Sequence, residues 1–226
     1  MDYEEFRTLV PRFAGREAGG RELAKSLASL RQKPNAVVLA LPRGGVVTAS
    51  VVARELDLPF DVLIVRKLGV PGHAELAMGA IGGDGVRILN WDVIASLRIP
   101  PEEIERVARE EEIELERRDR LFRGGLGPLD LRHKDVILVD DGIATGATME
   151  AAIAVARRAG AARVVAAAPI GTVETCRRLR LQTDELVVLE TPEPFFAVGY
   201  WYEDFPQVED NEVKQILIEA QSVAAL

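Results

Sequence analysis

Five short runs of branched apolar residues most limit what this chain can fold into. They span Ala36–Leu41, Phe60–Val65, Val136–Val139, Arg163–Ile170 and Glu185–Glu190. Within each run the apolar character is nearly continuous, as in strands whose two faces are both covered. Helical patterns separate most of these runs, which predicts right-handed βαβ units around a mostly parallel, doubly wound α/β sheet.

The segments between the runs predict helices and one hairpin. Helices are expected at Val46–Leu56, Thr148–Ala159 and Val173–Leu179, with an amphipathic helix near Gly20–Leu30 and a long charged helix over Pro100–Phe122. The stretch Ala77–Leu89 has Gly-Asp-Gly at its centre between apolar segments, which is typical of a β-hairpin.

Composition narrows the class of protein. The 226 residues suit one α/β domain with an elaboration or two small domains, and no apolar run is long enough to span a bilayer. The net charge of -8 disfavours non-specific binding to nucleic acid or to an anionic membrane. The single cysteine, Cys176, excludes an internal disulfide and is compatible with a reducing cytoplasm, where we expect the protein to act.

The stretch VILVDDGIATGAT (Val136–Thr148) places two acids directly after a predicted strand. In an open parallel sheet, ligands bind beyond the carboxyl ends of the strands. Two glycines, two threonines and the start of a helix follow Asp140 and Asp141, and their N–H groups form a cradle suited to a phosphate. Because acids repel a bare phosphate, we expect them to face vicinal hydroxyls or a magnesium ion. A ribose 5-phosphate carries both the hydroxyls and the phosphate.

A generic turn with one aspartate capping the next helix would explain only one acid and one glycine. The whole pattern resembles the phosphoribosyl-pyrophosphate signature of the type I phosphoribosyltransferases, and the resemblance extends over about Ala36–Glu190. It implies that Asp140 and Asp141 hold the 2- and 3-hydroxyls of the ribose. It also implies that the 5-phosphate is bound, largely through backbone N–H groups, by Ala144, Thr145, Gly146, Ala147 and Thr148.

A second anion-binding loop is expected after the first predicted strand, in LALPRGGVVTA (Leu39–Ala49). Arg43 is a permanent cation, and Gly44 and Gly45 let backbone N–H groups approach an anion closely. The pyrophosphate loop of the family lies at this position. The resemblance also implies a cis peptide bond between Pro42 and Arg43.

Arg66 and Lys67 leave the second predicted strand and enter a Gly- and Pro-rich stretch. Taken alone, they are typical of a solvated strand end. The family has a mobile basic loop here, whose closure excludes water and brings cations to the departing pyrophosphate. The resemblance therefore implies catalytic roles for Asp140, Asp141, Arg66 and Lys67.

The segment ETPEPFFAVGYWYEDF (Glu190–Phe205) gathers aromatic residues in a chain that has few of them. Part of it resembles the stretch with which hypoxanthine-guanine phosphoribosyltransferases stack on a purine, which implies that Phe196 stacks on the base. A hydrophobic lid or a dimer contact explains the aromatic residues equally well. In 6-oxopurine enzymes the position of Ala144 is an aspartate that acts as a general base. Alanine cannot accept a proton, so the acceptor stays open between a purine and another nitrogenous base.

The resemblance implies one domain over residues 1–226, with a core at about 34–190, a hood or tail at about 191–226, and a small lid formed by the terminal segments and a hairpin-bearing flexible loop. The expected enzyme is a Mg2+-dependent phosphoribosyltransferase that transfers ribose 5-phosphate from phosphoribosyl pyrophosphate to a nitrogenous base, as in nucleotide salvage. Asp140 and Asp141 would contact Mg2+ only through water, and the family implies a homodimer. Two alternatives stay open: a regulator that binds the donor without turnover, and an unrelated α/β module for nucleotides or sugar phosphates.

Overall fold

A parallel sheet of five strands forms the centre of the computed structural model, which describes residues 10–83, 85–124 and 129–224. The strand order is β2-β1-β6-β7-β8. The bounds are Ala36–Ala40 for β1, Phe60–Val62 for β2, Asp135–Val139 for β6, Arg163–Ile170 for β7 and Glu185–Glu190 for β8. Each strand falls on a predicted apolar run, so the expected mostly parallel α/β sheet is confirmed.

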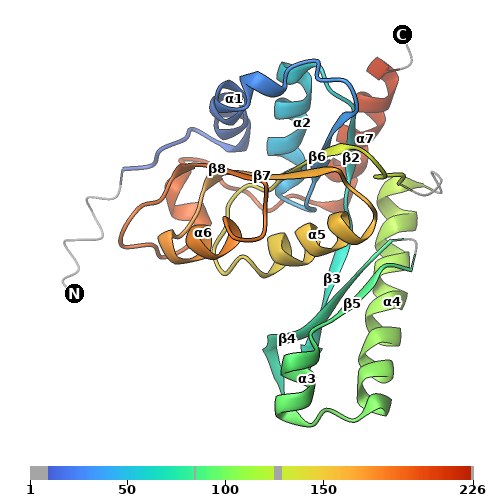
Figure 1. The fold of residues 1–226 in the computed structure, drawn as a ribbon. Coiled ribbons are helices and arrows are strands. Elements are labelled where there is room, and N and C mark those ends of the chain that lie inside the picture. The colour runs from blue at the N-terminus through green and yellow to red at the C-terminus, as the bar shows by residue number, and fades with distance from the viewer. Residues whose placement is uncertain (1–9, 84, 125–128, 225–226) are drawn as a thin grey trace.

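Helices cover both faces of this sheet (Figure 1). On one face lie α1 (Arg16–Ser26), the short 3-10 helix η2 (Ala28–Leu30), α2 (Gly45–Leu56) and α7 (Asp210–Ala224). On the other face lie α5 (Ala147–Arg158) and α6 (Val173–Leu179). The long helix α4 (Pro101–Arg123) passes beside the sheet and contacts α7.

The core consists of two apolar layers that meet the sheet from opposite sides. Along each strand, successive side chains point to opposite faces. Val38 and Ile137 therefore join the cluster under α1 and α2, whereas Leu39 and Leu138 join the cluster under α5. All four side chains are fully buried, which explains why the apolar runs in the sequence are continuous rather than alternating.

A second, antiparallel sheet projects from the body of the molecule with α3 (Trp91–Leu97) and α4 (Figure 1). It has the order β3-β4-β5, with bounds Val65–Val70, His73–Gly82 and Arg87–Leu89. The pairing of β4 with β5 confirms the predicted hairpin.

The stretch after β2 differs from its prediction. The predicted strand Phe60–Val65 ends at Val62, and Val65 already belongs to β3. What the sequence predicts as a basic loop is a hairpin of β3 and β4, in which Leu68 and Val70 are buried with the period of a strand. Gly72 supplies the turn with a φ of 78°.

The hood predicted from the terminal segments is formed by residues that are far apart in the sequence. Phe13 and Tyr202 form a parallel β-bridge, and the N–H groups of Arg12 and Phe13 donate to the carbonyl oxygen of Trp201. Trp201 belongs to a short 3-10 helix, η3 (Val198–Trp201), that follows β8. The two chain segments thus close over the end of the sheet together.

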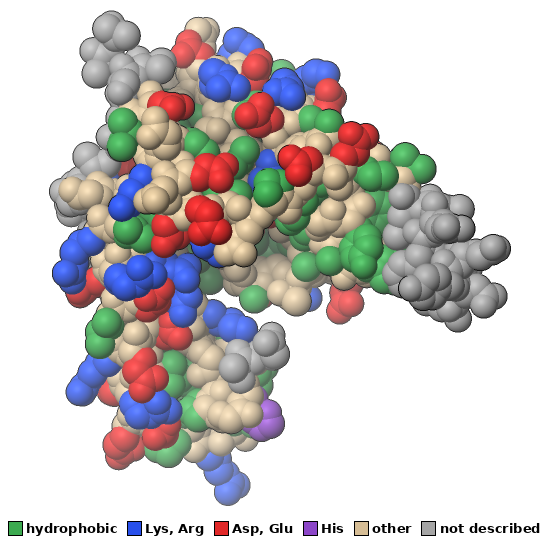
Figure 2. Space-filling view, turned by 180° about the vertical axis from the view of Figure 1, so that it is seen from behind, with side chains coloured by type: hydrophobic (Ala, Val, Ile, Leu, Met, Phe, Trp, Pro, Cys, Tyr) green, Lys and Arg blue, Asp and Glu red, His purple; other side chains and the backbone are tan. Residues whose placement is uncertain are grey.

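The surface carries charges of both signs, intermixed over the body and the projecting lobe (Figure 2). The two parts meet at a concave angle, which is visible in the same view. Across the described ranges, no helix is long and apolar enough to cross a membrane.

Leu138→Ala is expected to lower the free energy of unfolding by about 2–5 kcal/mol, because it opens a cavity in the centre of the sheet. Urea unfolding measures this change. Ile113→Ala is the control, since Ile113 is 71% exposed on α4 and its truncation should cost within about 0.5 kcal/mol. Equal losses in the two variants would contradict this description of the core.

Candidate active site

Two of the predicted motifs meet at one edge of the sheet, because β1 and β6 are parallel neighbours. The loop with Pro42, Arg43 and Gly44 follows β1, and Asp140 and Asp141 follow β6. A Cβ atom added to Gly44 would collide with Oδ2 of Asp141, so a residue without a side chain is required at this contact. The predicted cis peptide bond between Pro42 and Arg43 is present.

Asp141 is the most heavily contacted residue of the pair. Its Oδ2 accepts a hydrogen bond of 2.7 Å from Nε of Arg16, and the two side chains are only 14% and 9% exposed. The guanidinium of Arg16 also lies 3.6 Å from the ring centroid of Phe205 and donates through Nη1 to the carbonyl of Pro206 at 2.7 Å. The hydroxyl of Tyr202 donates to the backbone carbonyl of Asp141 at 2.5 Å. Segments from both ends of the sequence therefore hold this aspartate in place.

Asp140 is partly buried, and its Oδ1 accepts the N–H of Asp141 at 2.8 Å. Burial raises the pKa of Asp140 well above its usual value, and the neighbouring charge of Asp141 adds to this effect, whereas Arg16 opposes it. Burial and, next, the charge of Asp141 also raise the pKa of Tyr202. The site thus disfavours a second negative charge, and hydroxyl donors or a cation beside Asp140 would favour its ionised form.

The loop after the acids is fixed by side chains of α6. The carbonyl of Ala144 accepts from Oγ1 of Thr175 at 2.8 Å, and the carbonyl of Thr145 accepts from Nη2 of Arg178 at 2.6 Å. In a trans peptide the C=O and N–H bonds point in opposite directions. The N–H groups of Thr145 and Gly146 are therefore directed away from α6, as a phosphate cradle requires.

Helix α5 begins directly after this loop. Gly146 has a φ of 80°, and Ala147 is the first helical residue. The first N–H groups of a helix lack partners within the helix and carry its positive dipole end. The side chains of Thr145 and Thr148 are exposed at this end. Residues 144–148 thus lie in one turn of chain at the start of α5, and their binding of a phosphate stays a prediction.

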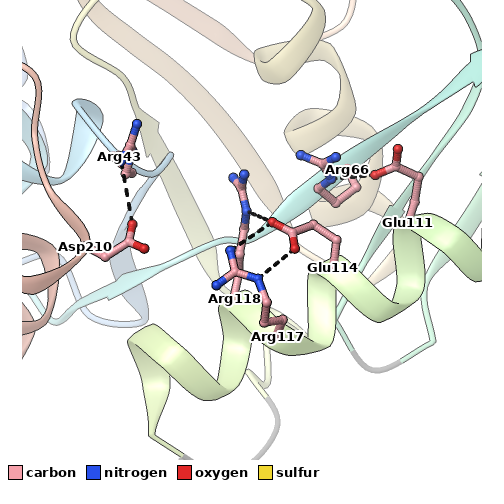
Figure 3. Close-up of polar contacts among 7 residues, drawn as sticks. All are labelled: Arg43, Arg66, Glu111, Glu114, Arg117, Arg118 and Asp210. Atoms are coloured by element: carbon pink, nitrogen blue, oxygen red, sulfur yellow. Dashed lines mark hydrogen bonds and ion pairs between the residues drawn. The ribbon is translucent and has the colours of Figure 1, made fainter.

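Two of the predicted cationic residues face acids of the protein (Figure 3). Nη1 of Arg43 lies 3.8 Å from Oδ1 of Asp210, the first residue of α7, and both side chains are partly exposed. Nε of Arg66 donates to Glu111 of α4 at 2.6 Å. In the view of Figure 3, Arg117 and Arg118 of α4 lie between these two pairs. Both cations are therefore paired with carboxylates of the chain itself.

Arg66 and Lys67 are consecutive residues of a strand, so their side chains leave opposite faces of the small sheet. Arg66 points to α4, whereas Lys67 lines a hollow of about 590 Å³ between β3–β5 and α5. Ala147, at the start of α5, and Trp91, which is 66% exposed, line the same hollow. The structure thus does not bring the two cations to one point, and their joint action on a leaving group stays a prediction.

Phe196 lies on the surface of the hood. It is 37% exposed, and its ring centroid is 5.9 Å from that of Tyr200. The side chain of Val198, two residues further on, packs against Gly142 in the loop after the acids. The hood thereby reaches the acid pair, and stacking of Phe196 on a base stays a prediction.

The sequence prediction missed several residues that support the site. They are Arg16, Thr175, Arg178, Tyr202 and Phe205. Arg16 left a signal, because it lies on the same helical stripe as Gly19, Gly20 and Leu23, which are all buried. A charged residue on an apolar stripe indicates a buried partner.

The acid pair suits a hydrated magnesium ion better than a metal held by the protein alone. In the part of the chain that the structure describes, no group of three or more His, Cys, Asp or Glu side chains could hold a metal ion. Mg2+ characteristically keeps several waters and binds through one or two carboxylates plus phosphate oxygens of a substrate. Asp140 and Asp141 offer carboxylates beside the Arg43 loop, which fits that mode of binding.

Comparison with known proteins assigns the family. The sequence profile of the phosphoribosyl transferase domain matches residues 14–203, most of the chain. The chain therefore belongs to the phosphoribosyl transferase family, and its fold is that of the type I phosphoribosyltransferases. The enzyme class expected from the sequence, a pentosyltransferase, is the class of this family.

Two relatives are informative. The crystal structure of TT1426 from Thermus thermophilus is 42% identical, with a TM-score of 0.84, and the match covers 92% of this chain and 98% of that one. The Mycobacterium tuberculosis protein Rv0571c, named by inference as a phosphoribosyl transferase, is 50% identical over 205 residues. That match covers 91% of this chain but 46% of Rv0571c, so the chain spans about half the length of this curated relative.

Asp140→Asn is expected to stabilise the ligand-free protein at neutral pH. The raised pKa means that the folded protein favours the protonated carboxyl of Asp140. The stability that this carboxyl contributes is therefore present at acid pH and is lost as pH rises through the folded-state pKa. Asparagine is neutral throughout. The gain in unfolding midpoint over the wild type should therefore be largest at about pH 8 and vanish near about pH 4, as measured by thermal unfolding without added metal.

Asp184→Asn serves as a control of opposite sign. The N–H of Val164 donates to Asp184 at 2.7 Å and lowers its pKa, and Arg157 adds to this effect. The stability from Asp184 is thus present at neutral pH and lost as pH falls, so this variant should unfold at a lower temperature at about pH 8. A lowered midpoint for Asp140→Asn at the same pH would show that Asp140 is not strained by burial.

Proposed function

We propose that the chain is a Mg2+-dependent phosphoribosyltransferase, which transfers ribose 5-phosphate from phosphoribosyl pyrophosphate to a nitrogenous base and releases pyrophosphate. One observation carries the proposal: the acid pair, the phosphate cradle and the Arg43 loop meet at the carboxyl ends of two neighbouring strands. Hydroxyls, phosphate and pyrophosphate are the three groups of this donor. Each of these three groups has a protein group of complementary chemistry at this edge.

The assigned roles follow from the chemistry of each group. Asp140 and Asp141 hold the 2- and 3-hydroxyls and stabilise positive charge on the sugar while the C1–O bond to pyrophosphate breaks. The N–H groups of residues 144–148 bind the 5-phosphate, which fixes the ring. Arg43 and the N–H groups of Gly44 and Gly45 stabilise the departing pyrophosphate. A ring nitrogen of the base forms the new bond to C1 and gives up its proton to water.

Five further features belong to this proposed function. Mg2+, held through water by Asp140 and Asp141 and directly by the donor, would neutralise charge on the pyrophosphate. The acceptor is a purine or a related base, with Phe196 stacking on it from the hood. The residues 1–226 act as one domain, and two copies associate as a homodimer, which sedimentation can test. The reaction takes place in the cytoplasm, in keeping with a chain that has one cysteine.

Arg43→Ala separates the pyrophosphate end of the donor from the ribose end. It should weaken binding of phosphoribosyl pyrophosphate by about 10- to 100-fold, because a charge-assisted contact is lost, and leave binding of ribose 5-phosphate unchanged. Asp141→Asn should weaken the binding of both ligands. Calorimetry in the presence of Mg2+ measures both affinities. Equal losses for the two ligands in Arg43→Ala would place the pyrophosphate elsewhere.

Lys67→Ala distinguishes an enzyme from a regulator that only binds the donor. If Lys67 acts on the leaving group of an enzyme, this variant should lose about 10- to 100-fold in turnover rate. Its affinity for the donor should fall much less. Release of pyrophosphate with a panel of purines and pyrimidines measures turnover, and Lys25→Ala is the control because Lys25 is exposed on α1. Tight donor binding by the wild type without transfer to any base would reject the enzyme and favour the regulator.

A further inference from the structure

Arg16 is a buried cation whose purpose the fold alone does not explain. Its side chain is 9% exposed, and burying a charge is costly unless it is paired and hydrogen-bonded. An apolar side chain at the first position of α1 would pack against the same neighbours without that cost. The arginine is therefore best explained by what it contacts at the acid pair.

The guanidinium of Arg16 connects α1 with three other segments. Nε bonds to Oδ2 of Asp141, Nη1 bonds to the carbonyl of Pro206, and the planar group lies over the ring of Phe205. The backbone of Gly44 passes close by, because a Cβ there would lie 3.1 Å from Nε of Arg16. Only arginine has a flat fork that can make all these contacts at once.

These contacts fix one oxygen of Asp141 and thereby the direction of the other. With Oδ2 held by Arg16 and the backbone carbonyl held by Tyr202, the carboxylate cannot turn freely about its bond to the main chain. Arg16 also pairs its positive charge with Asp141, the neighbour of the partly buried Asp140. A side chain that must meet a ribose hydroxyl in one orientation benefits from being held before the ligand arrives.

We propose that Arg16 is a positioning residue, which acts on the ribose end of the donor through Asp141 and does not itself bind the pyrophosphate. The inference rests on the proposed function, since it concerns the same donor. It assigns a role to the N-terminal helix, which carries no part of the phosphoribosyl-pyrophosphate signature. It also gives Arg16 a different role from Arg43, although both residues line a cavity of about 420 Å³ with Gly44 and Phe205.

A double-mutant cycle tests this role. The affinity for ribose 5-phosphate is measured by calorimetry for the wild type, Arg16→Met, Asp141→Asn and the double variant. Arg16→Met is expected to weaken binding by about 10- to 100-fold in the wild-type background, and by less than about threefold when Asp141 is already replaced. An equal loss in both backgrounds would show that Arg16 does not act through Asp141 and would overturn the inference.

Inorganic pyrophosphate is the second probe. If Arg16 positions Asp141, Arg16→Met should bind pyrophosphate as the wild type does, whereas Arg43→Ala should bind it more weakly. Loss of pyrophosphate affinity in Arg16→Met would make Arg16 a direct contact of the leaving group and would overturn the inference.

Arg123→Met is a matched control for general destabilisation. Arg123 pairs with Asp61 at 3.1 Å, and the two side chains are 10% and 17% exposed, close to the values for Arg16 and Asp141. This variant should lose thermal stability and keep the wild-type affinity for ribose 5-phosphate. If Arg123→Met weakens ribose 5-phosphate binding as much as Arg16→Met does, the effect of Arg16→Met comes from lost stability alone, and the inference is overturned.

If Arg16→Met does not fold, the cycle is run with Arg16→Lys and judged by the same criteria. Lysine keeps the charge but has a single donor group, so it cannot bond Asp141 and Pro206 and lie flat on Phe205 together. The cycle also separates this inference from the proposed function. A wild type that binds neither ribose 5-phosphate nor phosphoribosyl pyrophosphate rejects both, whereas binding with additive losses rejects only the role of Arg16.

Discussion

The parallel pairing of β1 with β6 is the constraint on which the candidate site depends. Because the two strands run in the same direction side by side, the loops that leave their carboxyl ends are neighbours without any further arrangement. One loop supplies a cation and closely spaced N–H groups, and the other supplies two acids and a helix N-terminus. The contact between Gly44 and Asp141 is so close that a side chain at position 44 would separate the loops.

This proximity has an electrostatic cost that the rest of the molecule offsets. Two adjacent carboxylates repel each other. The raised pKa of Asp140, which is partly buried, reflects its burial first and this repulsion second. Arg16 supplies the compensating charge for Asp141 from a different layer of the fold. The site is thus stabilised by a helix that precedes the sheet in the sequence and by a tail that follows it.

Much of the fold could be predicted because local pattern and burial agree. Continuous apolar runs correspond to strands covered on both faces, and the loop proposed to bind a phosphate depends on glycine and threonine residues within a single turn of chain. The missed features depend on partners distant in sequence. The role of Arg16 is apparent only from its contact with Asp141, 125 residues away. The basic stretch after β2 forms a strand because the side chains of Leu68 and Val70 are buried in the core. The helices α3 and α7 also went unpredicted, since each depends on packing against the projecting lobe or α2 and α4.

The hood joins Phe13 to Tyr202, and Asp141 is held by both Arg16 and Tyr202. During synthesis the acid pair and its arginine leave the ribosome well before the tail does. The sheet can assemble in that interval, but the aspartate lacks the partner that fixes its backbone carbonyl. A nascent chain can therefore form much of its core before Tyr202 emerges and fixes the backbone of Asp141.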